Sequence, residues 1–376
     1  MMQALVNGRI VVDGELREGL SVVLDGDRIA AVTNAPPLDA EVYDLEGRVL
    51  APGYIDVQVN GGGGVLFNDD PSVETVATIA AAHRRFGTTG LLPTLISDDL
   101  DVIAAAIAAT DAAIKAGVPG ILGVHIEGPF LNMDRRGVHD ATKIRRLDDA
   151  ALGVLSSARH GRTLVTLAPE TTTPEMTRAL AARGVRICAG HTDADYETLK
   201  AAFSNGVTGV THLFNAMSPM TSRAPGAVGA ALENQDAWCG IIPDGWHVDP
   251  AVLRIALACR PHDRFMLVTD AMPGVGSPED HFMLQGRRVT VADGQARLPD
   301  GSLAGSDLDM AGAVRNAVAW LNLTLPQAVE MASASPAAFL GLEAQTGRIA
   351  PGLRADLVEL NSDLSVRRSW IAGRAS

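Results

Sequence analysis

Apolar runs of strand length alternate with alanine-rich helical stretches over most of this 376-residue chain. Parallel strands need helical crossovers and are buried on both faces, so this alternation is typical of a parallel sheet covered by helices. Eight runs have this character, and they lie at 53–59, 89–96, 120–127, 163–170, 185–192, 206–213, 237–245 and 264–271. Eight such strands predict an α/β fold of the (β/α)8 TIM-barrel type.

Helical patterns are expected between most of these strands and again after the last one. They lie at 72–86, 99–116, 174–183, 195–204, 250–259, 306–321 and 326–340. A turn-rich segment at 282–303 is expected to form β structure between the last strand and the final helices.

The two ends of the chain share a different pattern. Residues 2–50 and the C-terminal tail consist of short alternating apolar runs broken by Gly and Asp, which is typical of strands joined by turns. We therefore expect one small β-sandwich domain built from residues 1–51 and 346–376, and a barrel domain at 52–345.

Charge and composition exclude several classes of protein. A net charge of −13 and a pI near 5.1 repel nucleic-acid phosphates and anionic lipids, and basic residues form only pairs such as Arg135-Arg136. Neither nucleic acid nor a membrane is expected as a partner. With no leader-like or spanning apolar stretch, a cytoplasmic location is expected. The widely spaced Cys188, Cys239 and Cys259 favour reduced thiols over disulfides.

Ionisable residues, Asp244 among them, stand at the carboxyl ends of several predicted strands, where a TIM-type barrel carries its active site. Glu127, His191 and His212 end three of them. A buried carboxylate and two imidazoles need a partner, and one divalent cation would satisfy all three. Three protein ligands and an open fourth position are typical of catalytic zinc. Asp270 ends another strand and would take the proton from a metal-bound water.

Each of these residues has a plain structural alternative. A single histidine at a strand end is more often a hydrogen-bonded core residue, and Glu127 alone could cap a loop. Four such residues at four strand ends favour one shared site. His125 lies deeper on the same strand face as Glu127, so an orienting role is expected for it rather than ligation. Histidines in helices or loops are expected at the surface, namely His83, His160, His262 and His281.

Seven segments carry a resemblance to a known family. They are PGYIDVQVNGGGGVLFND (52–69), HIEGPF (125–130), AGHTDA (189–194), THLFNAM (211–217), PDGWHV (243–248), VTDAM (268–272) and LAGS (303–306). In this order they resemble the N-acetylglucosamine-6-phosphate deacetylases of the amidohydrolase superfamily. The resemblance implies a metal-dependent homodimer of amino-sugar catabolism. Its reaction would convert N-acetyl-D-glucosamine 6-phosphate to D-glucosamine 6-phosphate and acetate.

The resemblance also implies roles for individual residues. Glu127, His191 and His212 match the metal ligands, and Asp270 matches the catalytic acid/base. His139 matches the residue that polarises the acetyl carbonyl, a role that is both catalytic and substrate-binding. Further substrate contacts are implied for Val138, Asn215, Ala216, Arg223, His247, Leu303, Ala304 and Gly305. The arginine that Arg223 matches reaches the neighbouring subunit's substrate across the dimer interface.

One departure from the wider superfamily concerns the number of metal ions. There the first barrel strand often ends in His-x-His and holds a second ion, but here the pair is Gln58 and Asn60. Neutral amides are poor ligands for zinc-like ions, and no lysine ends a barrel strand. We therefore expect one divalent ion per chain, Zn²⁺ first, with Fe²⁺, Co²⁺ or Mn²⁺ as alternatives. A weak second site near Gln58 and Asn60 stays open.

Two other functions stay open at this point. The same barrel could hydrolyse a different amide, such as a cyclic ureide or an N-acyl amino acid, and a substrate panel would separate these cases. A catalytically silent barrel could instead serve as an assembly scaffold, although such a protein has no reason to retain metal ligands and a base. The sequence leaves open the native metal, the tolerance for other N-acyl sugars and any assembly beyond a dimer.

Overall fold

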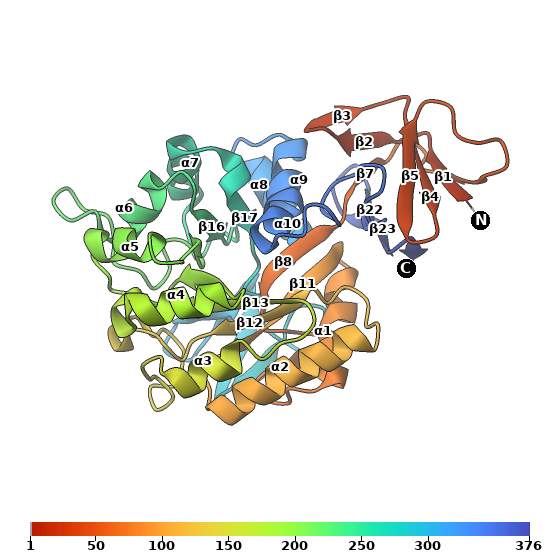
Figure 1. The fold of residues 1–376 in the computed structure, drawn as a ribbon. Coiled ribbons are helices and arrows are strands. Elements are labelled where there is room, and N and C mark those ends of the chain that lie inside the picture. Colours follow the sequence, from red (N-terminus) through yellow and green to blue (C-terminus); the bar gives the residue numbers. More distant parts are fainter. Residues whose placement is uncertain (1) are drawn as a thin grey trace.

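The structure, a computed structural model, describes residues 2–376 and contains an eight-stranded parallel barrel (Figure 1). Its strands are β8 (Tyr54–Val59), β11 (Thr88–Ile96), β12 (Gly123–Glu127), β13 (Arg162–Leu167), β14 (Arg186–Ala189), β15 (Gly209–Val210), β16 (Trp238–Ile241) and β17 (Phe265–Leu267). Each pairs with its neighbour in chain order, and a parallel bridge between Val59 and Ala271 joins the two ends of this sheet. The eight predicted strands and the (β/α)8 architecture are confirmed.

Helices cover the outside of the barrel. The α-helices are α1 (Val73–Arg84), α2 (Leu100–Lys115), α3 (Asp149–Leu155), α4 (Pro174–Ala182), α5 (Tyr196–Phe203), α6 (Gly226–Glu233), α7 (Pro250–Cys259), α8 (Met310–Trp320), α9 (Leu325–Ala332) and α10 (Ala334–Leu340), and the 3-10 turns are η1 (Met133–Arg135), η2 (Pro169–Thr171) and η3 (His262–Arg264). Each predicted helical segment contains a helix, but the segment 326–340 divides at Ser333. The sequence did not predict α3 or α6. In α6 two glycines lower the helix propensity, and the burial of residues 226–232 stabilises the helix instead.

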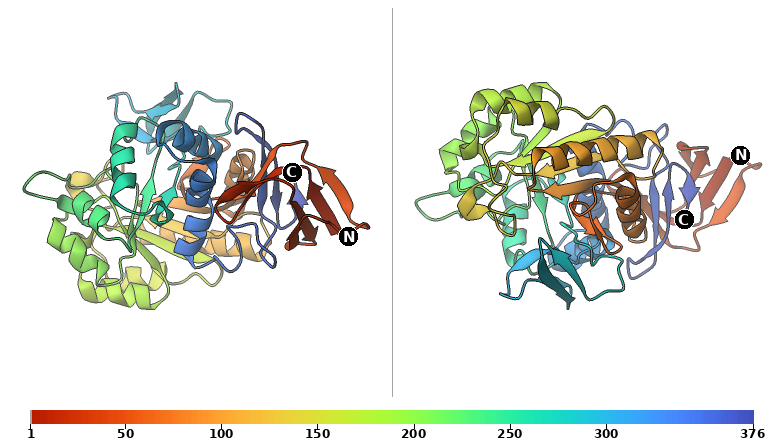
Figure 2. Two further views of the ribbon diagram at one scale, coloured as in Figure 1. Left: turned by 90° about the horizontal axis from the view of Figure 1, so that it is seen from above. Right: turned by 90° about the horizontal axis from the view of Figure 1, so that it is seen from below.

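Strands from both ends of the chain form two further sheets beside the barrel. One has the order β5-β4-β1-β6, and the other has the order β24-β23-β22-β7-β2-β3. Their bounds are β1 (Met2–Val6), β2 (Arg9–Val12), β3 (Glu15–Arg17), β4 (Ser21–Asp25), β5 (Arg28–Thr33), β6 (Glu41–Asp44), β7 (Val49–Pro52), β22 (Leu357–Leu360), β23 (Val366–Ile371) and β24 (Arg374–Ala375). Figure 2 shows both chain ends on this side of the barrel.

The six-stranded sheet lies between the barrel and the four-stranded sheet. Successive side chains of a strand point to opposite faces, and Val49 and Ala51 of β7 pack into the barrel core whereas Leu50 packs against the other sheet. Trp370 is buried in this second cluster. The two terminal sheets therefore form the expected β-sandwich, and one of them also covers the barrel.

A third small sheet lies at the mouth of the barrel. It consists of β18 (His281–Leu284), β19 (Arg287–Ala292), β20 (Gln295–Arg297) and β21 (Leu303–Ser306), and the two-stranded ribbon β9 (Gly61–Gly62) and β10 (Val65–Leu66) lies after β8. A bridge between Ala271 and Ser306 joins β21 to the segment that follows the last barrel strand. An apolar cluster that includes Ile96, Met272 and Ala304 packs beneath the third sheet.

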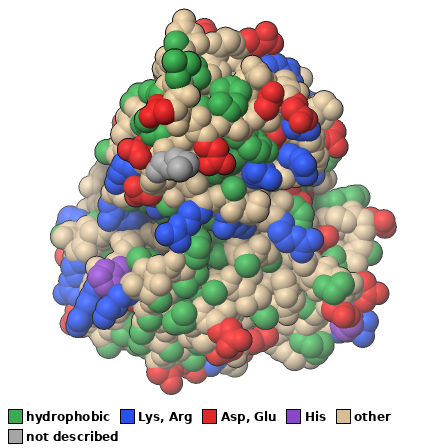
Figure 3. Space-filling view, turned by 90° about the vertical axis from the view of Figure 1, so that its right-hand side faces the viewer, with side chains coloured by type: hydrophobic (Ala, Val, Ile, Leu, Met, Phe, Trp, Pro, Cys, Tyr) green, Lys and Arg blue, Asp and Glu red, His purple; other side chains and the backbone are tan. Residues whose placement is uncertain are grey.

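The surface carries side chains of both charges. On the face shown in Figure 3, basic side chains are most frequent across the middle, and acidic side chains lie mostly above and below them. Among residues 2–376 we find no helix with the length and apolar character needed to cross a membrane.

Candidate active site

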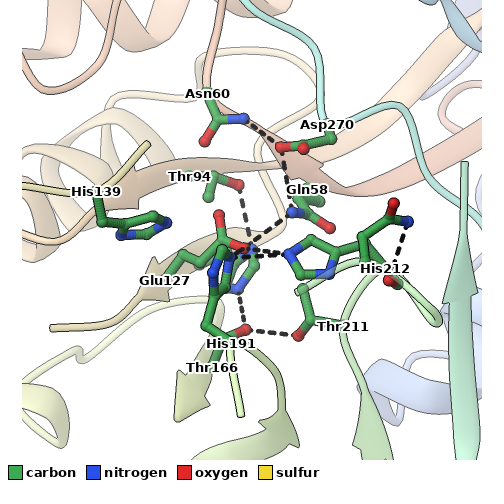
Figure 4. Close-up of polar contacts among 12 residues, drawn as sticks. Gln58, Asn60, Thr94, Glu127, His139, Thr166, His191, Thr211, His212 and Asp270 are labelled. Carbon is green, nitrogen blue, oxygen red and sulfur yellow. Dashed lines mark hydrogen bonds and ion pairs between the residues drawn. The ribbon is translucent and has the colours of Figure 1, made fainter. Parts of the chain in front are cut away.

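Four of the predicted residues meet at the carboxyl end of the barrel (Figure 4). Glu127 ends β12, His191 and His212 follow β14 and β15, and Asp270 follows β17. The Oε1 atom of Glu127 lies 3.2 Å from Nε2 of His191 and 3.0 Å from Nε2 of His212, and the two Nε2 atoms are 3.0 Å apart. The side chains of the first three are buried. One small volume is therefore bounded by one carboxylate oxygen and two imidazole nitrogens.

Three of these residues have a left-handed backbone. The φ angle is +47° at His191, +32° at His212 and +53° at Asp270. Non-glycine residues seldom adopt this conformation, which costs of order 1–3 kcal/mol, and it concentrates at functional sites. The sharp turn directly after each short strand directs the side chain inward over the mouth of the barrel.

The tautomer of His191 follows from its second nitrogen. Its Nδ1 atom lies 2.9 Å from the carbonyl oxygen of Arg135, and a carbonyl can only accept a hydrogen bond. Neutral His191 therefore carries its proton on Nδ1 and directs the lone pair of Nε2 at the Glu127 carboxylate. Two electron-rich atoms 3.2 Å apart are stabilised by a cation between them. Ligand atoms about 2.0–2.1 Å from a tetrahedral zinc lie roughly 3.3 Å apart, close to the separations seen here.

The ionisation states of Glu127 and His212 depend on each other. Burial disfavours the ionised form of Glu127, but the two neighbouring imidazoles of His191 and His212 outweigh it and hold the carboxyl pKa well below its usual range. Burial likewise disfavours the charged form of His212, yet the hydrogen bond and charge of Glu127 raise the pKa of this imidazole. The carboxylate is therefore ionised and attracts positive charge, whether from a proton or from a metal ion.

His139 is a third imidazole at the same place. Its ring centre lies 4.5 Å from that of His191, and burial, followed by the charge of His191, lowers its pKa to about 3. Potential ligand atoms of Glu127, His139 and His191 all lie within 4.8 Å of one another, so these three residues form an alternative metal-binding group. The Nδ1 atom of His139 lies 3.2 Å from the main-chain N and 2.7 Å from Oγ of Ser97.

Two side-chain amides hold Asp270. Nε2 of Gln58 donates to Oδ1 of Asp270 and to Oε1 of Glu127, both at 3.2 Å, and Nδ2 of Asn60 donates to Asp270 at 2.6 Å. Loss of solvation in the barrel mouth and the charge of Glu127 raise the pKa of Asp270 to about 6. The Gln58 and Asn60 side chains thus act here as hydrogen-bond donors to the two carboxylates.

His247 is held in place by the carboxylate of Asp244. Its Nδ1 atom lies 2.6 Å from Oδ2 of Asp244, while Oδ1 of Asp244 accepts the main-chain N–H groups of Trp246 and His247. Burial works against the ionised form of Asp244, but the hydrogen bond and charge of His247 lower the pKa of this carboxyl. The second ring nitrogen of His247 stays available to a ligand.

A cavity of about 210 Å³ lies over these groups. The predicted residues in its wall are Glu127, Val138, His139, His191, His212, Asn215, Ala216, His247, Asp270, Leu303 and Gly305. Ala304 is instead fully buried in the apolar cluster beneath the third sheet. Arg223 is exposed on the loop before α6 and does not line the cavity. No lysine or arginine of the described chain appears among the lining residues.

Sequence reasoning missed several residues around this cavity. Ile96 and Met272 form an apolar part of its wall, and Ser97 contacts His139 from behind. Ser97 directly follows the predicted strand 89–96, and its polar side chain at a strand end was the available signal.

His83 was expected at the surface but is fully buried, with Nε2 2.9 Å from the carbonyl oxygen of Gly61. That bond holds the loop after β8.

His125 lies two residues before Glu127 on β12 and faces the interior of the barrel below the site. It is fully buried, and its Nε2 atom lies 2.8 Å from Oγ1 of Thr166, whose hydroxyl also contacts that of Thr211 at 2.6 Å. On its other side, Nδ1 lies 3.3 Å from Oγ1 of Thr94. Both ring nitrogens are therefore occupied by hydroxyl groups below the site.

Comparison with known proteins agrees with this geometry. The amidohydrolase family matches residues 49–375. An N-acetylgalactosamine-6-phosphate deacetylase of Shewanella sp. (strain ANA-3) is 45% identical over 89% of this chain and 85% of its own. An N-acetylglucosamine-6-phosphate deacetylase of Haemophilus influenzae is 32% identical over 100% and 99%. The crystal structure of N-acetylglucosamine-6-phosphate deacetylase from Pasteurella multocida superposes with a TM-score of 0.96 at 33% identity, covering 100% of both chains. The chain belongs to the amidohydrolase family.

Proposed function

We propose that this enzyme hydrolyses the N-acetyl group of N-acetyl-D-glucosamine 6-phosphate to give D-glucosamine 6-phosphate and acetate. The observation that carries the proposal is the convergence of Glu127, His191 and His212 beside Asp270 at the barrel mouth. A catalytically silent scaffold would have no use for these four residues. A cyclic ureide or an N-acyl amino acid as substrate is disfavoured, because relatives matched over nearly the whole chain are amino-sugar phosphate deacetylases.

One divalent ion per chain, with zinc as first choice and Fe²⁺, Co²⁺ or Mn²⁺ as alternatives, completes the proposed site. We assign Glu127, His191 and His212 as its ligands. His139 is the less suitable third ligand, because an N–H donor to its Nδ1 leaves the proton on Nε2. Such an ion supplies Lewis acidity and lowers the pKa of a bound water. Since Gln58 and Asn60 are occupied as donors to the two carboxylates, they favour a single ion.

The protein groups then divide the proton transfers. Asp270 accepts the proton of the attacking water and later delivers it to the departing sugar nitrogen, acting first as base and then as acid. Its raised pKa, about 6, suits both steps near neutral pH. The Nε2–H group of His139 donates to the acetyl carbonyl oxygen, where negative charge develops. Measured acetate release from the sugar phosphate, with and without a chelator, tests the proposal as a whole.

The 4-epimer, N-acetyl-D-galactosamine 6-phosphate, is a second candidate substrate. It is favoured by the 45% identity to the Shewanella deacetylase, compared with 32% to the Haemophilus one. Both epimers carry the same amide and phosphate, so the catalytic group described above would act on either. The ratio of kcat/KM for the two epimers, measured on one enzyme preparation, decides between them.

We place the enzyme in the cytoplasm. Cys188, Cys239 and Cys259 are unpaired, and free thiols persist in reducing compartments. The division into a terminal β domain (1–51 and 346–376) and a barrel domain (52–345) belongs to the same proposal, supported by the separate apolar cluster between the two terminal sheets.

Among residues 2–376 no lysine or arginine lines the cavity, so an arginine for the phosphate of the substrate has to come from elsewhere. Arg223 lies on the loop between β15 and α6, which projects from the barrel as the green loop beside α6 in Figure 1. Met220 on this loop and Ile255 on α7 are exposed apolar side chains. We propose a homodimer in which Arg223 reaches the phosphate bound by the other subunit, with its guanidinium matching phosphate geometry.

Arg223→Ala is expected to raise KM for the 6-phosphate substrate and to leave the poor turnover of the unphosphorylated sugar nearly unchanged. A charge-assisted contact contributes about 1.5–3 kcal/mol, which corresponds to roughly 10- to 150-fold in KM. Arg178→Ala, at an exposed arginine of α4 that pairs with Glu175, is the matched control and should keep the wild-type KM.

Mixing subunits shows from which chain the arginine comes. In a heterodimer of Arg223→Ala and Asp270→Asn chains, one site combines an intact Asp270 with an intact Arg223 from the other chain. We therefore expect mixing to restore part of the activity. If heterodimers form and no activity returns, Arg223 acts within its own chain or not at all.

A further inference from the structure

His139 receives two hydrogen-bond donors from one residue. The main-chain N–H of Ser97 points at Nδ1 of His139 with an N···N distance of 3.2 Å, and Oγ of Ser97 lies 2.7 Å from the same atom. A main-chain N–H can only donate, so Nδ1 must offer a lone pair. The neutral ring then carries its single proton on Nε2, and the Ser97 hydroxyl becomes a second donor to Nδ1.

Ser97 is held firmly at this position. It is 2% exposed and directly follows β11, whose last residue, Ile96, is bound through both its main-chain N–H and C=O by the side-chain amide of Asn68, at 3.0 Å each. On the other side Gly128 approaches so closely that a Cβ atom there would lie 2.3 Å from Oγ of Ser97. The backbone before the serine and the space around its hydroxyl are therefore both fixed.

Two neighbouring imidazoles are thus given opposite tautomers by main-chain groups. A carbonyl, that of Arg135, faces Nδ1 of His191 and leaves its Nε2 with a lone pair. An N–H, that of Ser97, faces Nδ1 of His139 and leaves its Nε2 with a proton. The first nitrogen suits a metal ligand and the second suits a hydrogen-bond donor to an oxygen atom.

We infer that Ser97 is a positioning residue that sets the tautomer and the ring orientation of His139, so that the Nε2–H group points at the acetyl carbonyl oxygen of the substrate. The inference rests on the proposed function for the identity of that oxygen. The tautomer of His139 does not depend on the proposed function, because it follows from the contacts of Ser97 alone. Ser97 is not among the residues that line the cavity, so it acts through the imidazole.

The tautomer of His139 is tested on the wild-type protein by NMR, without an activity assay. In zinc-loaded protein with ¹⁵N-labelled histidine, Nδ1 of His139 is expected to give a pyridine-like resonance and Nε2 a pyrrole-like one. The signals are assigned by their loss in His139→Asn. A pyrrole-like Nδ1 overturns the inference whether or not the protein deacetylates anything. If the tautomer is as stated but neither sugar phosphate is hydrolysed, the proposed function fails and the assignment of Ser97 to the His139 tautomer stands.

The contribution to turnover is tested with Ser97→Ala, which removes the hydroxyl group without adding any atom to this closed space. Loss of the hydroxyl bond is expected to lower kcat about 3- to 10-fold, with KM and bound zinc unchanged, because the main-chain N–H remains. The loss should shrink for the N-trifluoroacetyl substrate, whose carbonyl is more electrophilic and depends less on a donor. An unchanged kcat in a folded, zinc-loaded Ser97→Ala protein contradicts the inference, as does an equal loss on both substrates.

Discussion

His212→Ala is expected to abolish metal binding and deacetylation together. The variant removes one of the three proposed metal-ligand atoms, which lie 3.0–3.2 Å from one another. Two remaining ligands bind a catalytic ion weakly, and the ion supplies several kcal/mol of transition-state stabilisation, so kcat should fall at least ~10³-fold. His191→Ala should behave in the same way. Elemental analysis of the purified proteins, alongside acetate release, measures both effects.

The control for these variants is His262→Ala. His262 lies in η3, where its ring contacts Glu330 at 2.9 Å on the outside of the barrel, and its loss should leave metal content and kcat unchanged. Wild-type protein should hold about one divalent ion per chain, which a chelator removes with loss of activity. Two tightly bound ions per chain, or a fully loaded His212→Ala protein, would contradict the proposed ligand set.

Asp270→Asn is expected to lower kcat at least ~10²-fold while the fold and the bound metal are retained. The amide is nearly isosteric, and its oxygen can still accept the hydrogen bonds from Gln58 and Asn60. What it loses is the ability to take a proton from water and return it to the sugar nitrogen. Steady-state kinetics with both epimers, together with the metal content, measure this effect.

Asp307→Asn is the matched control for this variant. Burial also raises the pKa of Asp307, but this carboxyl lines a different cavity, next to Trp320 on α8, so kcat should stay near the wild-type value. Near wild-type turnover by Asp270→Asn would show that another group transfers the proton.

The barrel could be predicted because its strands are buried on both faces and therefore read as uninterrupted apolar runs. An ionisable residue at the end of such an apolar run is easily recognised in the sequence. The structure brings Glu127, His191, His212 and Asp270 together, as expected from their positions. Their individual roles stay predictions. Gln58 and Asn60 were noticed as poor ligands, but their donation to the two carboxylates depends on side-chain directions that spacing alone does not determine.

The remaining features depend on tertiary structure. The left-handed backbone at His191, His212 and Asp270 has no local signature, because histidine and aspartate do not demand it as glycine would. Helix α6 has a sequence that resembles a loop and forms because its side chains are buried. The contact of Ser97 with His139 joins residues 42 positions apart, and no pattern of period 2 or 3.6 reports such a pair.

The sheet shared by the two ends of the chain has a consequence for biosynthesis. Tyr43 donates to Glu359 at 2.8 Å across 316 residues of chain, and β7 pairs with β22 over a similar interval. Residues 2–50 leave the ribosome long before their partners at 357–375 are made. During translation the early strands therefore expose unpaired edges and apolar faces, a state prone to association with other chains. The barrel can assemble meanwhile, but the sheet that covers one side of it closes only after residues 357–375 have been synthesised.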